Sequence, residues 1–505
     1  MEYIGALFDL YGAGAEFVTS PRALMLIFFG TVIGIVFGCM PGLSSTMALA
    51  LFTPLTFGFT PSEGIVFLIA IYVSSVYAGA IAAILVNIPG TPSAIATGLD
   101  GYPMAQRGEA GRALGLATIA SFLGGLVGVT VLMLFSPVLA QVARNFGSWE
   151  YAMLALLGLT LISYVSPGSI VKGLIGGTIG LMLASIGEEV IFAYPRFTGG
   201  IAELGGGLHM VVLMIGFFGF SELFSQVETG VKATVQQKVE GILQSFREVR
   251  SHGGTILRSS LLGTLIGILP GAGGSIASIT AYGVAKRISP RSAEFGTGNP
   301  EGIVAGESSN NASVGGALVP MLTMGIPGDP MTAVLIGALM IHGLAPGPGL
   351  FVQYPEFVSA IFLGFIIALV FMLIVGLAAA RPFARLLSFP KPIVLAVITL
   401  MCVAGSYAIQ NSIFDIGIAL AAGVAGYLLR KVDVHPAPII LGIVLGPLLE
   451  VNLRRSLLLG DGSLMPFLTR PLSVTMIVII LLVIFGPALL RPITRARARA
   501  RSKSA

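Results

Sequence analysis

The chain is poor in charged residues and in cysteine. Charged residues fill 10% of its 505 positions and hydrophobic residues fill 55%, whereas a soluble domain is about 25% charged. A soluble globule with so few charges would expose large apolar patches. The two cysteines, Cys39 and Cys402, both lie in apolar runs, which argues against a disulfide framework or a thiolate metal site.

Several catalytic motifs are also missing. The sequence contains no Gly-x-x-x-x-Gly-Lys-Ser/Thr, no His-Glu-x-x-His and no Gly-x-Ser-x-Gly, so a P-loop ATPase, a zinc protease and a serine hydrolase lack support. We therefore predict that the chain is not an enzyme. Its net charge of +5 gathers mostly in the tail 491–505, which is a topology signal in a membrane protein and predicts no nucleic-acid partner.

Apolar stretches near the ~20 residues that a membrane span needs follow one another along the chain. The pattern predicts an all-α polytopic membrane protein with roughly 12 transmembrane helices plus half-helices or re-entrant hairpins. Four stretches look too short to cross alone: 44–59, 256–269, 271–285 and 436–450.

One polar insert, 227–254, interrupts this apolar pattern. It carries charges of both signs at helix-compatible spacing, and we interpret it as a cytoplasmic linker. It separates a first repeat half with additional spans, 1–226, from a second repeat half with additional spans, 255–490. The basic tail 491–505 is predicted to be cytoplasmic.

Two motifs occur twice, in the same order. GIVFGCMPGLSST at 34–46 matches GTLIGILPGAGGS at 263–275, and IPGTP at 88–92 matches IPGDP at 326–330. Either match alone would be weak in a chain with 67 glycines. Two matches in the same order predict an internal repeat.

The positions of Lys and Arg predict that the two copies are inverted across the membrane. In the first copy, Arg107 and Arg112 follow the second motif. In the second copy, Lys286, Arg287 and Arg291 follow the first motif. Because Lys and Arg stay on the cytoplasmic side, this pattern favours inverted repeats, an architecture in which interrupted helices point to the substrate site.

The Pro-Gly motifs are candidates for a substrate site. Proline and glycine break a helix, and a helix that restarts presents free N–H groups and a positive dipole end, which favour an anion. A plain kink between closely packed helices is the alternative. The predicted substrate-binding residues are Pro41, Gly42, Ser44, Ser45, Thr46, Pro270, Gly271, Gly273, Gly274 and Ser275.

The second copy also contains a polar run, GESSNNAS at 306–313, between its two motifs. Buried carboxylate and amide oxygens suit a hard cation such as sodium. The alternative is a capping and turn sequence just outside the bilayer. The IPGTP and IPGDP motifs could add backbone carbonyls, or they could be tight turns. The predicted cation-binding residues are Glu307, Asn310, Asn311, Pro89, Gly90, Thr91, Pro327, Gly328 and Asp329.

At these residues the sequence resembles the large membrane subunit of the tripartite tricarboxylate transporter family, the TctA-like proteins. Three stretches carry the resemblance: GTVIGIVFGCMPGLSSTMALALFTPLTFG, GTLIGILPGAGGSIASITAYGVAKR and FGTGNPEGIVAGESSNNASVGGALVPMLTMGIPGDPMTAVLIGAL. The last is long and specific. The resemblance covers nearly the whole chain.

The resemblance implies a subunit of a bacterial inner-membrane transporter that works with a small four-helix membrane subunit and a periplasmic solute-binding protein. It implies import of tricarboxylates or related organic acids by cation symport, usually with sodium and without a further cofactor. From the inverted repeats we expect alternating access, and from the positions of Lys and Arg we expect a periplasmic N-terminus and a cytoplasmic C-terminus. A proton-coupled carboxylate transporter and a passive anion channel remain as alternatives.

Overall fold

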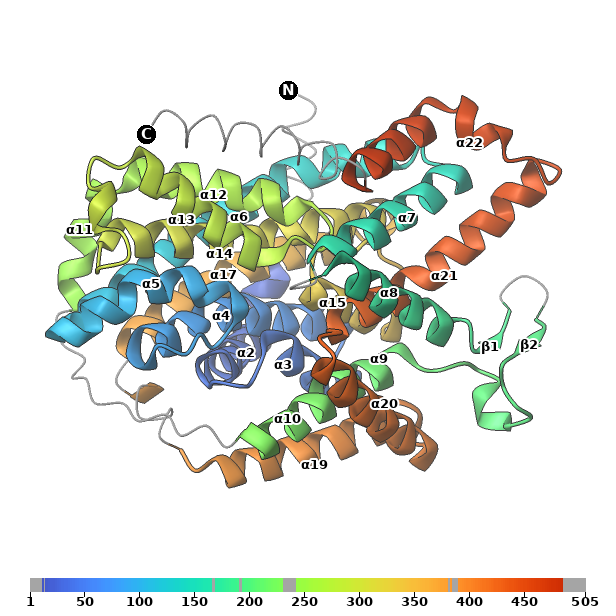
Figure 1. Ribbon diagram of the computed structural model, residues 1–505, viewed down its shortest axis with the longest axis horizontal. Coiled ribbons are helices and arrows are strands. Elements are labelled where there is room, and N and C mark those ends of the chain that lie inside the picture. Colours follow the sequence, from blue (N-terminus) through green and yellow to red (C-terminus); the bar gives the residue numbers. More distant parts are fainter. Residues whose placement is uncertain are drawn as a thin grey trace, which may run out of the picture. The chain divides into compact units, whose positions relative to one another are not determined.

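The computed structural model of the protein describes residues 11–484 except 13, 166–168, 190–192, 230–241, 380–381 and 384–388. The predicted tail 491–505 and the middle of the predicted linker 227–254 lie outside these residues. The described chain is almost entirely helical (Figure 1). Its two short strands, β1 (Gly187–Glu188) and β2 (Pro195–Arg196), pair antiparallel, with Gly187 opposite Arg196.

The chain forms two compact units. The first comprises 1–144 and 208–432, and the second comprises 145–207 and 433–505. The division into halves at 1–226 and 255–490 stays a prediction. The first unit holds α2 (Pro21–Cys39), α3 (Ser45–Phe52), α4 (Pro61–Val86), α5 (Ile95–Met104), α6 (Ala110–Ala143), α9 (Met210–Met214), α10 (Ser221–Thr229), α11 (Ser245–Ser251), α12 (Gly253–Ile268), α13 (Gly273–Ile288), α14 (Pro300–Met324), α15 (Pro330–Ile341), α16 (Gly349–Gln353), α17 (Pro355–Ala378), α19 (Lys391–Gln410) and α20 (Ile413–Lys431). The second holds α7 (Ser148–Val165), α8 (Ile170–Ala184), β1, β2, α21 (Pro436–Leu459) and α22 (Met465–Thr469).

The protein is an all-α polytopic membrane protein. Eight helices of the described residues are long and apolar enough to cross a bilayer, and shorter apolar helices accompany them. Three of the stretches expected to be short are short: α3 has 8 residues, and α12 and α13 have 16 each. The total of roughly 12 crossings stays a prediction.

The expectation that 436–450 is too short to cross is wrong. The helix α21 has 24 residues and continues to Leu459. The charged residues of its C-terminal part form ion pairs. Glu450 accepts from Arg196, which lies far away in the sequence, at 2.6 Å, and it lies 3.2 Å from Arg454, four residues later. Pairing offsets the cost of charge near an apolar segment, so the polar composition after residue 450 does not end the helix.

The internal repeat is visible in helix packing. The pairs α2/α12, α3/α13, α4/α14 and α5/α15 follow one another in the same order in the two copies. Gly34 and Gly38 of α2 lie against the carbonyl oxygens of Ile71 and Ser75 in α4, and a methyl group at either glycine would overlap them. Glycine at such contacts lets two helix backbones approach closely.

The second copy packs in the same way. Gly263 and Gly267 of α12 lie against the carbonyl oxygens of Ser309 and Ser313 in α14. The two long helices also end alike, because Asn87 after α4 and Gly325 after α14 both take the left-handed conformation, with φ of 55° and 72°. Asn and Gly are the residues that tolerate this helix end. The structure thus supports the repeat, while its inversion across the membrane stays a prediction.

The two copies interlock within the first unit. The helix α6, which follows the first copy, packs along α14, and α17, which follows the second copy, packs along α4. Similarly, α3 contacts α15, and α13 contacts α5 and the short turn before it. Figure 1 shows α13, α14 and α12 beside α5 and α6. Both α4 and α14 are buried along almost their entire length, so they form the core that positions the candidate site.

Candidate functional site

The first Pro-Gly break is the turn between α2 and α3. Gly42 takes a φ of 90°, which glycine adopts without strain, and its carbonyl accepts from the Gln226 side chain of α10. The Ser44 hydroxyl caps α3 by accepting from the Met47 N–H at 3.1 Å. One of the predicted hydroxyls is therefore already engaged with the helix end. The Ser45 hydroxyl, by contrast, is buried and has no hydrogen-bond partner among the described residues.

The second Pro-Gly break lies between α12 and α13 and differs at the helix start. No side chain caps α13, because its N-cap residue is Ala272, whereas the N-cap residue of α3 is Ser44. Gly271 donates its N–H to the Gly328 carbonyl at 2.7 Å, which joins the two breaks of this copy. The first turn of α13 therefore keeps free N–H groups, which is the feature that attracts an anion to a helix start.

Each Pro-Gly helix start meets the second break of the other copy. Thr46 at the start of α3 donates to the Met331 sulfur at 3.2 Å, just after the second-copy break. Ser278 of α13 donates to the Ser93 carbonyl at 2.7 Å, just after the first-copy break. These contacts bring four helix breaks, far apart in the sequence, into one region of the first unit.

The second breaks hold different polar groups. In the first copy, the hydroxyls of Thr91 and Ser93 lie 3.1 Å apart. In the second copy, Asp329 is the N-cap of α15 and accepts from the Thr332 N–H at 2.8 Å and the Thr332 hydroxyl at 2.9 Å. The Tyr72 hydroxyl of α4 also donates to Asp329. The carboxylate of Asp329 is thus bonded on both oxygens, and a tight turn with a helix cap accounts for it.

The polar run 306–313 lies inside α14, and all of its residues are buried. The run is therefore part of a buried helix and not a capping and turn sequence. The Glu307 carboxylate accepts from the Thr97 hydroxyl of α5 and, at 2.8 Å, from the Ser121 hydroxyl of α6. No basic side chain of the described residues is paired with Glu307. A buried charge without a countercharge is costly and marks a functional position in a membrane helix.

The two asparagines of the run leave acceptors free. Asn310 donates to the Val76 carbonyl of α4 at 3.3 Å, and Asn311 lies 3.5 Å from the Met372 sulfur. The side-chain oxygens of both have no partner in the described part of the chain. The Asn310 oxygen lies against Gly274, so close that a methyl group there would meet it at 2.6 Å. Predicted substrate residues and predicted cation residues are therefore in direct contact.

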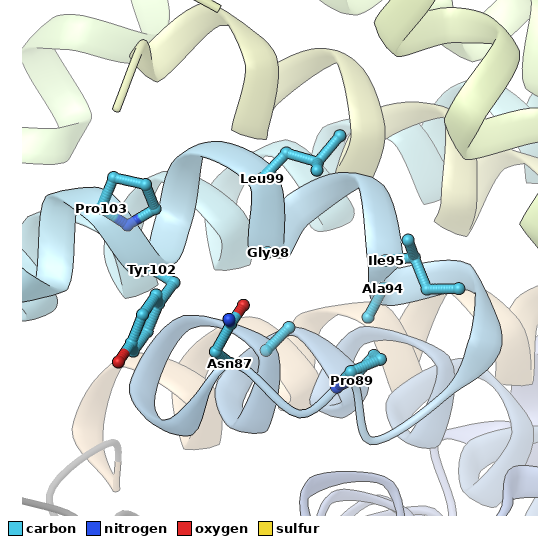
Figure 2. Close-up of a pocket in the computed structure, with 9 residues that line it drawn as sticks. Asn87, Pro89, Ala94, Ile95, Gly98, Leu99, Tyr102 and Pro103 are labelled. Atoms are coloured by element: carbon cyan, nitrogen blue, oxygen red, sulfur yellow. The ribbon is translucent and has the colours of Figure 1, made fainter. Parts of the chain in front are cut away.

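A cavity of about 380 Å³ opens beside the first-copy break. Figure 2 shows Asn87 pointing into the space between the end of α4 and α5, with Pro89 on the connecting turn. Its lining is mostly apolar and has no basic side chain; it consists of Ala83, Asn87, Pro89, Ala94, Ile95, Gly98, Leu99, Tyr102 and Pro103. Among the predicted site residues, Pro89 is the one that lines this cavity.

Sequence reasoning missed three polar residues that the structure brings to the site. Thr97 and Ser121 bond Glu307, and Tyr72 bonds Asp329. All three are fully buried. A hydroxyl inside an apolar helix is a weak signal, because many such hydroxyls bond the carbonyl one turn earlier, as Thr118 does to Leu114 at 2.7 Å.

Comparison with known proteins gives a consistent result. The sequence profile of the Tripartite tricarboxylate transporter TctA family matches residues 24–441. An uncharacterised 52.8 kDa protein of the TAR-I ttuC′ 3′ region of Agrobacterium vitis is 35% identical over 472 residues, which cover 92% of this chain and 93% of that protein. An uncharacterised protein of the TAR-II ttuC′ 3′ region of the same organism is 36% identical over 215 residues, 43% of this chain and 89% of that protein. No solved structure matches the chain.

Proposed function

Because the chain belongs to the tripartite tricarboxylate transporter TctA family, we propose that it is the large membrane subunit of a binding-protein-dependent importer of tricarboxylates or related organic acids. The import is cation symport by alternating access, with sodium as the coupling ion. The observation that carries this proposal is the meeting of four helix breaks next to a buried carboxylate, Glu307, that has no basic partner among the described residues.

The starts of α3 and α13 bind the carboxylate groups of the substrate. The uncapped N–H groups of α13 and the free Ser45 hydroxyl are donors without a partner among the described residues. A negatively charged ligand is stabilised by such donors and by the positive end of the helix dipole. Pro41, Gly42, Pro270 and Gly271 shape the two turns.

The cation binds at Glu307 and the asparagines of α14. The cation site and the substrate region are close together, since Asn310 touches Gly274 of the substrate region. A cation at Glu307 therefore neutralises the buried carboxylate and reduces the repulsion between this carboxylate and the substrate anion. Repulsion between like charges at close range is strong in a low-dielectric interior. Substrate and cation therefore favour each other's binding, which is the thermodynamic basis of symport.

The partners are a small four-helix membrane subunit and a periplasmic solute-binding protein, and the location is a bacterial inner membrane. The repeats supply two interlocked helix groups, as expected for alternating access. A transport assay has to contain this subunit, the small membrane subunit and the binding protein together, since the binding protein delivers the substrate.

The test is uptake of labelled citrate into liposomes that contain the complete system, with and without an inward sodium gradient. We expect gradient-dependent, saturable uptake that Ser45→Ala and Ser275→Ala weaken. Thr53→Val is the matched control, because this buried hydroxyl of the same region bonds the Leu49 carbonyl at 2.8 Å. Equal uptake with and without the gradient would refute sodium coupling, and unsaturable flux would indicate a passive channel.

Proton coupling is the second candidate, favoured by the same observation. The buried Glu307, which no base in the described part of the chain pairs with, could be neutralised by a proton as well as by sodium. A pH jump imposed in the absence of sodium separates the two. Uptake driven by the proton gradient alone would favour this candidate.

A further inference from the structure

Glu307 differs from the other buried glutamates of the described residues, which pair with arginines. Glu63 pairs with Arg22 at 2.8 Å, and Glu150 pairs with Arg470 at 2.6 Å. Glu307 instead meets uncharged groups, the hydroxyls of Thr97 and Ser121 and the side-chain amide of Asn310. Hydroxyls relieve only part of the cost of burying a charge, because they carry no countercharge.

The two hydroxyls come from helices that are held close to α14. Gly306, next to Glu307, lies beside Thr97, and a methyl group on Gly306 would make an ordinary van der Waals contact with the Thr97 hydroxyl at 3.5 Å. Gly124, one turn after Ser121, lies directly against the backbone of Ser308. The Gly124 contact allows α6 to approach α14 closely and to bring the short Ser121 side chain to the carboxylate.

These groups have the chemistry of a ligand set for a small hard cation. Carboxylate and hydroxyl oxygens are hard ligands. A hydroxyl also has two lone pairs and a proton that can rotate, so it can donate to the carboxylate and can turn an oxygen lone pair to a cation. The unpartnered Asn310 oxygen, one turn along α14, is a further buried acceptor of this region.

We propose that Thr97 and Ser121, with Glu307, form the binding site for the coupling sodium ion. This inference rests on the proposed function. The site is built from both repeats, since α5 and α6 belong with the first copy and α14 lies in the second. Sodium binding therefore stabilises the contact between α5 and α6 on one side and α14 on the other. The carboxylate of Asp329 does not form this site, because its own helix start and Tyr72 already engage it.

The test is the binding of radioactive sodium to the purified full-length chain, measured without any substrate. Thr97→Val and Ser121→Ala should each raise the sodium concentration for half-saturation tenfold or more, and Thr97→Ser should restore binding close to the unchanged protein. Thr118→Val is the matched control. This hydroxyl is also buried on α6, but it bonds Tyr77 and the Leu114 carbonyl, so sodium binding should be unchanged.

Sodium binding to the unchanged protein is measured first, because this distinguishes a failure of sodium coupling from a failure of the residue assignment. If the unchanged chain binds no sodium, sodium coupling itself fails and the assignment is overturned with it. If the unchanged chain binds sodium and both hydroxyl variants bind it equally well, the assignment is wrong while the proposed function stands. Monodispersity on gel filtration identifies variants that do not fold. Ser121→Ala, which removes one oxygen, then serves as the decisive variant.

Discussion

Asp100 offers a sharp test of how the two copies are joined. This fully buried residue of α5 accepts the N–H groups of Gly296, Gly298 and Asn299, all at 2.8 Å, on one carboxylate oxygen. Its other oxygen accepts the Tyr282 hydroxyl of α13 at 2.9 Å. One side chain of the first copy thus anchors the loop before α14 and a helix of the second copy.

The expected cost of Asp100→Ala follows from these four bonds. A hydrogen bond to a charged group contributes about 1.5–3 kcal/mol, and a loop with two glycines can relax towards water and recover part of it. We expect a loss of about 3–5 kcal/mol, similar to the loss of one partner in a buried ionic network.

The assay is reversible unfolding of the detergent-solubilised protein, followed by the loss of helical circular dichroism. Asp100→Asn keeps one acceptor oxygen and should lose about 1–2 kcal/mol, and Tyr282→Phe, which removes one bond, about 1 kcal/mol. Because Asp100 and Tyr282 share a bond, the effects of their double variant should be less than additive. A loss below about 1 kcal/mol for Asp100→Ala, or an equal loss for Ala and Asn, would refute the reasoning.

Three further predictions concern packing and helix ends. Gly267→Leu should prevent stable folding, since its side chain would overlap the Ser313 backbone, and monodisperse protein on gel filtration would contradict this. Arg470→Met should cost about 1–3 kcal/mol of unfolding free energy, because the buried Glu150 loses its countercharge but keeps its bonds from the Gly147 N–H and the Ser473 hydroxyl. Restoration by the additional change Glu150→Gln would support the cause, and no restoration would count against it. Asp329→Ala should lower the free energy of unfolding by about 2–4 kcal/mol, because it removes the N-cap of α15 and the acceptor of the buried Tyr72 hydroxyl. Asp329→Asn should retain most of this free energy, and equal unfolding curves for the two variants would contradict the prediction.

Local composition predicted the helix breaks and their order. Proline and glycine act on the backbone within a few residues, so the turns after α2 and α12 and those after α4 and α14 could be found from the sequence. The same locality explains one error. The apolar stretch 436–450 looked too short to cross, but Glu450 at its end pairs with Arg196, 254 positions away, and α21 continues.

The sequence by itself determined the membrane class, the repeat and the polar run 306–313, because apolar composition, glycine spacing and clustered polar residues are properties of short segments. The tertiary structure decided where that run lies and what meets it. It placed Glu307 inside α14 and brought Thr97 to it across 210 positions. It also bonded Tyr72 to Asp329 across 257 positions. Such pairings depend on how the two copies pack against each other, and no local pattern encodes that.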